Sequence, residues 1–322
     1  MPVQIPDVTE KWAGAVRQVT LGATAAEGGT RTKTVTVGGE TTLPFLRFEG
    51  RMPNPPVVAV EIQDYEPKDW SAILREAWGD VVKDPAAWAQ KAEECGADLI
   101  YLHLRGVDNA GNETTPAQAA ETIKKVLRAT GLPLLVYGPG QPERDNELLV
   151  AVAEAAVGER IAMGVCEEKN YRTIVAAALA HNQLVVARTP IDINLAKQLN
   201  ILISDMAMPL DRVLMDPTTG ALGYGLEYTY SVMERLRLAA FQGDGMTQQP
   251  MICTVGEESW RQKESKFGQG VPSAWGDWVQ RGITWETITA TTLIHAGADI
   301  VTIRHPESVG LVKKAIAQLI AA

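Results

Sequence analysis

An eightfold alternation of apolar runs and helical patterns is the feature that most constrains the fold of this 322-residue chain. The runs are almost continuously apolar, as strands buried on both faces should be. They cover residues 57–64, 98–104, 133–139, 161–166, 184–190, 213–218, 250–256 and 299–306. Helical patterns follow them at residues 85–96, 116–131, 143–158, 170–182, 192–206, 230–243, 284–297 and 307–320. Eight such units predict an α/β fold of the (β/α)₈ type, the TIM barrel.

The first 50 residues follow a different pattern. Two short alternating segments, 16–22 and 32–40, flank the glycine-rich stretch EGGTRT, which predicts a β-hairpin. We expect an N-terminal hairpin extension at residues 1–50 that closes the bottom of a barrel at residues 51–322, in one domain overall. A doubly wound open sheet is the alternative, but no G-x-G-x-x-G follows the first apolar run.

Composition narrows the possible partners and the compartment. The net charge is −9 and Lys and Arg do not cluster, so we expect no nucleic-acid partner. No apolar run is long enough to span a membrane, and residues 1–12 lack the features of an export signal. Three well-separated cysteines suit a reducing cytoplasm and are too few for a four-cysteine iron–sulfur cluster.

Ligands of such barrels bind at the carboxyl ends of the strands, and this rule selects the candidate residues. They are Gln63, Asp64, His103, Arg105, Gly138, Cys166, Arg188, Thr189, Asp216, Thr218, Thr254, Gly256, Arg304 and His305. No H-E-x-x-H, G-x-S-x-G, P-loop or Cys/His spacing accompanies them, so we predict no metal site and no catalytic residue.

Several of these candidates also have an ordinary structural interpretation. Asp216 either opens a turn with Pro217 or faces a ligand, and both interpretations stay open. The loop after it contains Gly220 and Gly223, which let backbone approach a ligand closely. Asp192 is a natural helix N-cap, which leaves Asn194, one turn further, as a possible amide ligand. For any single Arg after a strand, an ion pair is favoured over an anion clamp.

The segment from 257 to 285 is a long connection that contains four tryptophans. Structureless loops of this length are usually lids, binding loops or partner contacts. The alternative is that the tryptophans pack the loop onto the barrel.

Five long motifs resemble a known family. They are GGTRTKTVTVGGETTLPFLRFEG, GADLIYLHLRG, the stretch from SDM through DRVLMDPTTGALGYGLEYTYSVMERLRLAAFQGD, PMICTVGEESWRQKE, and RGITWETITATTLIHAGADIVTIRHPE. Together they resemble, over nearly the whole chain, the small subunit of the corrinoid/iron–sulfur protein. That subunit is called delta in the archaeal acetyl-CoA decarbonylase/synthase complex.

The resemblance implies a division of labour. It implies a barrel that forms a heterodimer with a large subunit. The large subunit alone carries a 4Fe-4S cluster, and it holds the corrinoid against the mouth of the barrel. In this anaerobic acetyl-CoA (Wood–Ljungdahl) pathway, a separate methyltransferase passes methyl from methyltetrahydrofolate to cobalt(I), and acetyl-CoA synthase receives it. This chain has no D-x-H-x-x-G corrinoid signature, so the resemblance implies a cap without catalytic activity of its own.

We therefore expect the corrinoid to meet polar residues at the mouth. The candidates are Asp64, Arg188, Asn194, Asp216, Thr218, Gly220, Gly223 and Tyr224. The alternative function is a pterin-binding barrel methyltransferase acting on methyltetrahydrofolate, with Asp64, Asp192, Asn194 and Asp216 around the pterin. That alternative requires methyltetrahydrofolate to bind the isolated chain. A barrel aldolase is a weaker option, because no strand end carries a lysine.

Overall fold

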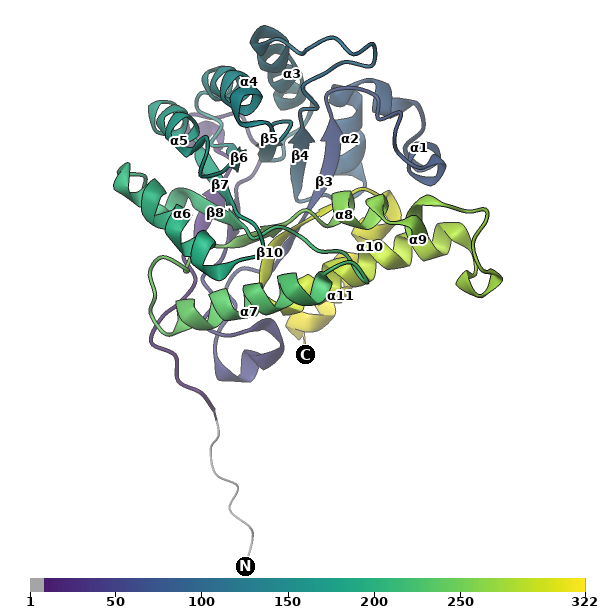
Figure 1. Cartoon of the computed structure of the whole chain (residues 1–322). Coiled ribbons are helices and arrows are strands. Elements are labelled where there is room, and N and C mark those ends of the chain that lie inside the picture. Colours follow the sequence, from purple (N-terminus) through teal and green to yellow (C-terminus); the bar gives the residue numbers. More distant parts are fainter. Residues whose placement is uncertain (1–8, 322) are drawn as a thin grey trace, which may run out of the picture.

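Eight parallel strands close into a barrel in the computed structural model, which describes residues 9–321 (Figure 1). Around the barrel the strand order is β10-β3-β4-β5-β6-β7-β8-β9. The strands are β3 (Val57–Gln63), β4 (Leu99–His103), β5 (Leu134–Tyr137), β6 (Ala162–Cys166), β7 (Leu184–Arg188), β8 (Val213–Asp216), β9 (Met251–Cys253) and β10 (Ala298–Ile303). The predicted TIM barrel is confirmed.

Helices surround the barrel (Figure 1). The α-helices are α1 (Ala72–Trp78), α2 (Pro85–Glu94), α3 (Pro116–Ala129), α4 (Pro142–Ala155), α5 (Tyr171–Ala180), α6 (Ile193–Asp205), α7 (Leu226–Phe241), α8 (Val255–Arg261), α9 (Lys263–Lys266), α10 (Trp278–His295) and α11 (Pro306–Ala321). The described residues also contain five 3₁₀ turns, η1 (Ala25–Glu27), η2 (Pro44–Glu49), η3 (Gly79–Lys83), η4 (Leu210–Arg212) and η5 (Ser273–Trp275).

Successive side chains of a strand point to opposite faces of the sheet, so the core divides into two layers. On β3, for example, Val58, Val60 and Ile62 belong to the large cluster shared with the surrounding helices. Val57 and Ala59 belong to a second cluster inside the barrel. Glu61 and Gln63 share the register of this inner face, so the sequence places a charge inside the barrel.

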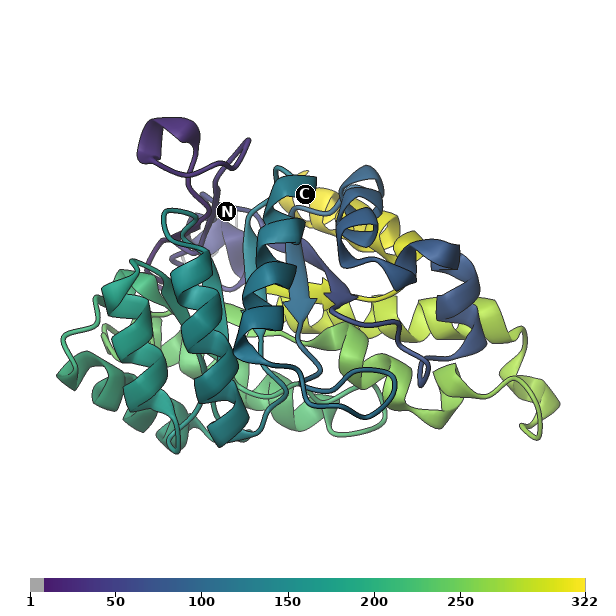
Figure 2. The ribbon, with the colours of Figure 1, turned by 90° about the horizontal axis from the view of Figure 1, so that it is seen from above.

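The N-terminal hairpin closes the lower end of the barrel, as expected. Strands β1 (Val19–Leu21) and β2 (Val35–Val37) pair antiparallel, and Figure 2 shows this segment at the end opposite the carboxyl ends of the strands. Its side chains at Val19, Leu21, Val35 and Val37 join the interior cluster, which also contains Leu99, Leu184 and Leu214 near the strand starts. The expectations drawn from residues 1–8 and 322 lie outside the described residues.

The sequence-based element boundaries need two corrections. Residues 257–285 do not form a structureless loop, because α8, α9 and η5 occupy much of the segment and α10 begins at Trp278. The last two residues of the predicted run 250–256 belong to α8, since β9 ends at Cys253. Short helix α1 was also missed: its seven residues give too few turns for a clear helical period.

Candidate functional site at the barrel mouth

A polar layer fills the barrel interior just below the carboxyl ends of the strands. It arises because the last inward-facing position of several strands is polar where the earlier ones are apolar. Its buried or partly buried members include Glu61, Gln63, Tyr101, His103, Tyr137, Arg188, Asp216, Thr302 and Arg304. Tyr101 and Tyr137 meet edge to face at 4.8 Å between ring centroids. The layer divides into two groups that lie on different strands.

The first group surrounds the carboxylate of Asp216, at the end of β8. The side chain is fully buried, and burial raises its pKa despite the nearby Arg188 cation. Tyr137 donates its hydroxyl to Oδ2 at 3.2 Å, and the backbone N–H of Thr218 donates to Oδ1 at 3.0 Å. Arg188 Nε lies 4.0 Å from Oδ2. The Thr218 contact confirms that Asp216 opens the turn, whereas its contact with a ligand stays a prediction.

The second group surrounds Glu61, on β3. Arg304 donates to both of its oxygens, each at 2.7 Å, in a bidentate pair between residues at the two ends of the chain. Gln63 donates its amide to Oε1 at 3.1 Å. Burial alone would raise the pKa of Glu61, but Arg304 and His103 together outweigh it and lower the value to about 2. Glu61 is therefore an ionised, structural carboxylate.

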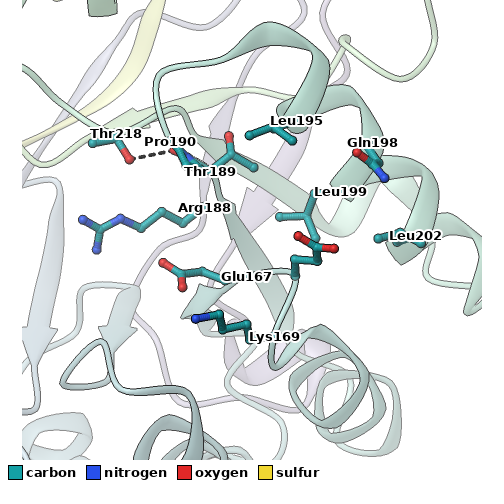
Figure 3. Close-up of a pocket in the computed structure, with 11 residues that line it drawn as sticks. Glu167, Lys169, Arg188, Thr189, Pro190, Leu195, Gln198, Leu199, Leu202 and Thr218 are labelled. Atoms are coloured by element: carbon teal, nitrogen blue, oxygen red, sulfur yellow. Dashed lines mark hydrogen bonds between the residues drawn. The ribbon is translucent and has the colours of Figure 1, made fainter.

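A cavity of about 440 Å³ opens beside the first group, above β6, β7 and β8 (Figure 3). Leu195, Leu199 and Leu202 of α6 contribute one apolar wall (Figure 3). Arg188 and Thr218 line it from the strand ends, and Thr218 Oγ1 donates to the Thr189 carbonyl at 2.6 Å. The volume and mixed lining suit a ligand of small-molecule size or a protruding part of a partner.

The structure brings together only part of the predicted site. Arg188, Asp216 and Thr218 form one contact network, whereas Asp64 lies at the end of β3 and accepts the Arg105 backbone N–H at 2.9 Å. Burial raises the pKa of Asp64 to about 6. Asn194 is exposed in the first turn of α6.

Asp192 caps α6, as its sequence position favoured. Its side chain accepts the backbone N–H of Asn194 at 2.7 Å and that of Leu195 at 3.0 Å. This cap orients the helix that carries the apolar wall of the cavity.

The glycine-rich loop after Asp216 folds against its own neighbours. A Cβ at Gly220 would lie 2.4 Å from the Gly225 carbonyl oxygen, so the chain itself requires glycine there. Gly223 has a φ of 74°, which favours glycine, and it is exposed. The Tyr224 hydroxyl donates to Glu264 of α9 at 2.9 Å. The loop therefore links the mouth to the segment after β9.

Comparison with known proteins identifies the family. Residues 18–311 match the family model described as the CO dehydrogenase/acetyl-CoA synthase delta subunit. The chain belongs to this delta-subunit family. It is 39% identical over 311 residues to the acetyl-CoA decarbonylase/synthase complex subunit delta of Methanosarcina mazei, covering 94% of this chain and 70% of the relative. The match to the subunit delta of Archaeoglobus fulgidus is 38% over 313 residues, with 95% and 68% covered.

Solved structures show the same fold in a different family. The chain superposes on Xanthomonas albilineans dihydropteroate synthase with a TM-score of 0.57 at 14% identity, covering 84% of this chain and 95% of that one. The Coxiella burnetii enzyme gives 0.57 at 11% identity, covering 95% and 98%. At these identities the likeness establishes the barrel fold alone.

Sequence reasoning missed several residues of the delta-subunit mouth. Glu61 was overlooked although a carboxylate inside an otherwise apolar strand was a usable signal. In the sequence, the leucines of α6 look like the apolar face of any helix. Only the fold shows that they line a cavity, because the residues opposite them come from other elements. Tyr137 resembled an ordinary core residue, and only the fold shows that its hydroxyl meets Asp216.

Within residues 9–321, no group of three or more His, Cys, Asp and Glu side chains is placed to hold a metal ion. Cys95, Cys166 and Cys253 are free thiols, and burial raises the pKa of all three. No helix in the described range is long and apolar enough to cross a lipid bilayer.

Proposed function

We propose that this chain is the small subunit of a heterodimeric corrinoid/iron–sulfur methyl carrier of the anaerobic acetyl-CoA pathway, and that its barrel mouth caps the corrinoid. Membership of the delta-subunit family supports this assignment. In the proposal the large subunit holds both the corrinoid and the 4Fe-4S cluster. Methyl reaches the carrier from methyltetrahydrofolate through a methyltransferase and leaves to acetyl-CoA synthase.

The observation that carries the capping role is the cavity beside Arg188. A corrinoid is a broad macrocycle with an apolar body and amide side chains at its edge. The leucine wall of α6 matches the apolar part, while Arg188, Thr189 and Gln198 offer groups that hydrogen-bond amides. The corrinoid supplies the cobalt atom that carries the methyl group. The contributions of this chain are to cover the macrocycle, pair its amides and exclude water.

One acid–base candidate at the mouth, Asp216, is already occupied by structural partners. Asp216 accepts hydrogen bonds from Tyr137 and Thr218, beside the cation of Arg188. Cys166, at the end of β6, is fully buried, and burial raises the pKa of its thiol. These arrangements support a cap that does no bond-making itself. The contacts suggested for Asp64, Asn194, Gly220, Gly223 and Tyr224 stay predictions.

The pterin-binding methyltransferase remains the alternative, and the local contacts give it no particular support. Three of the four residues it requires are engaged within the chain. Asp64 holds the Arg105 backbone, Asp192 caps α6, and Asp216 belongs to the Arg188 network.

A charge at the cavity rim should weaken assembly with the large subunit. Leu195 and Ile201 are each 39% exposed on α6, but only Leu195 lines the cavity. We expect Leu195→Glu to weaken binding to the corrinoid-loaded large subunit about tenfold or more, because a carboxylate would be buried against an apolar surface. Isothermal titration calorimetry measures this affinity.

Ile201→Glu is the matched control and should bind like the unmodified chain. If Leu195→Glu also binds like the unmodified chain, the cavity is not the surface that meets the large subunit, and the proposed cap is wrong.

A further inference from the structure

A second cavity lies at the mouth, on the side of β10, β3 and β4. Its volume is about 390 Å³, and α8 and α9 contribute to its wall. In the closed strand order β3 and β7 are four strands apart, so this cavity lies across the barrel from the cavity beside Arg188. The function proposed above makes no use of it.

Five polar groups in its wall are buried without a hydrogen-bond partner. They are Gln63 Oε1, Trp70 Nε1, Ser71 Oγ, Trp260 Nε1 and His103 Nδ1, and the first four are on residues no more than 9% exposed. None of the residues that line the cavity beside Arg188 carries such an atom. A buried polar group without a hydrogen-bond partner destabilises the folded chain, so the concentration of such groups in one wall points to a polar molecule that pairs with them.

The wall also favours a negatively charged molecule. Five of its 13 residues are basic, although the whole chain carries a net charge of −9. The basic residues are His103, Arg105, Arg261, Lys266 and Arg304. The two acidic ones are Asp69 and Glu257.

Two of these cations are available to a ligand. Arg304 is engaged by Glu61, and Arg261 by Glu257 at 2.8 Å. Arg105 lies 3.5 Å from Asp69, which is 70% exposed, so that pair is weak. The Nζ of Lys266 makes no hydrogen bond or ion pair with the residues of the described range.

We propose that this second cavity binds a small oxyanion, a carboxylate or a phosphate. Lys266 and Arg105 supply the positive charge, while the Trp70 indole N–H and the Ser71 hydroxyl donate hydrogen bonds. Gln63 Oε1 accepts one from a donor on the same ligand, or from a water that the ligand carries in. The site is separate from the corrinoid surface and does not depend on it.

Nuclear magnetic resonance of the indole N–H groups tests the site in the full chain. Glutarate and inorganic phosphate are the two probes, and Trp70→Phe assigns the Trp70 signal. We expect the Trp70 signal to move in a saturable manner with at least one probe. The indoles of Trp278 and Trp285 donate to the Ser265 and Leu222 carbonyls and should not move. A response to glutarate alone identifies a carboxylate site, and a response to phosphate alone identifies a phosphate site.

Charge removal supplies the second readout. Lys266→Gln and Arg105→Gln should each weaken binding of the responding probe about threefold to tenfold. Lys263→Gln, on the same short helix but outside the cavity wall, should leave the affinity unchanged. The proposal is overturned if neither probe moves the Trp70 signal, or if all three variants bind like the unmodified chain.

Discussion

Replacing Glu61 with Gln should lower the free energy of unfolding at pH 7 by about 3–5 kcal/mol. The substitution preserves the shape of the side chain but leaves the guanidinium of Arg304, a residue only 8% exposed, without its counter-charge. Urea denaturation of both proteins measures the difference. Glu94→Gln removes the carboxylate of the exposed pair with Lys91 and should change stability little.

The same pair predicts a dependence on pH. Arg304 and, to a smaller extent, His103 outweigh burial and lower the pKa of Glu61 from its ordinary 4.5 to about 2 in the folded protein. A lowered folded-state pKa contributes stability that is complete above the unfolded value and is lost as the pH falls towards the folded value. The difference between the Glu61→Gln variant and the unmodified protein should therefore be full at pH 7 and shrink below about pH 4.5. A constant difference across this range would contradict the ion-pair account.

Leu21→Ala should cost about 2–5 kcal/mol, because it opens a cavity where the hairpin meets the barrel interior. Leu21 is fully buried in the interior cluster. Leu311→Ala, at a position 41% exposed on α11, is the control and should change stability little. The measurement is denaturant unfolding followed by both tryptophan fluorescence and circular dichroism.

This experiment also tests the proposed single domain, in which the hairpin at residues 1–50 and the barrel at residues 51–322 unfold together. The two spectroscopic probes should then give coincident transitions for Leu21→Ala. A loss below about 0.5 kcal/mol, or a separate early transition, would mean that the hairpin is not part of the same cooperative unit.

The fold was predictable because its signal is local and repeated. Each apolar run is long enough to identify a buried strand, and the eightfold repeat selects the barrel. The two helices after β9 were harder to predict from the sequence, because α8 and α9 have only seven and four residues. A short amphipathic helix and a polar loop have nearly the same residue pattern.

The site was predictable only in part, for a geometric reason. A strand end marks Arg188 and Asp216 as mouth residues, and this signal is local. The pairing of Glu61 with Arg304 joins positions 243 residues apart, and only closure of the barrel brings them together. The second cavity combines side chains from β3, α1, α8 and α9, so no single segment of the sequence reveals it.

The most direct test of the capping role is the absorbance spectrum of corrinoid across size-exclusion elution. Corrinoid is mixed with this chain alone, with the large subunit alone, and with both. The account predicts that corrinoid absorbance elutes with this chain only when the large subunit is present, in a complex the size of the heterodimer. If the isolated chain retains corrinoid or methyltetrahydrofolate, it binds that ligand itself, and the proposed division of labour between the subunits is wrong.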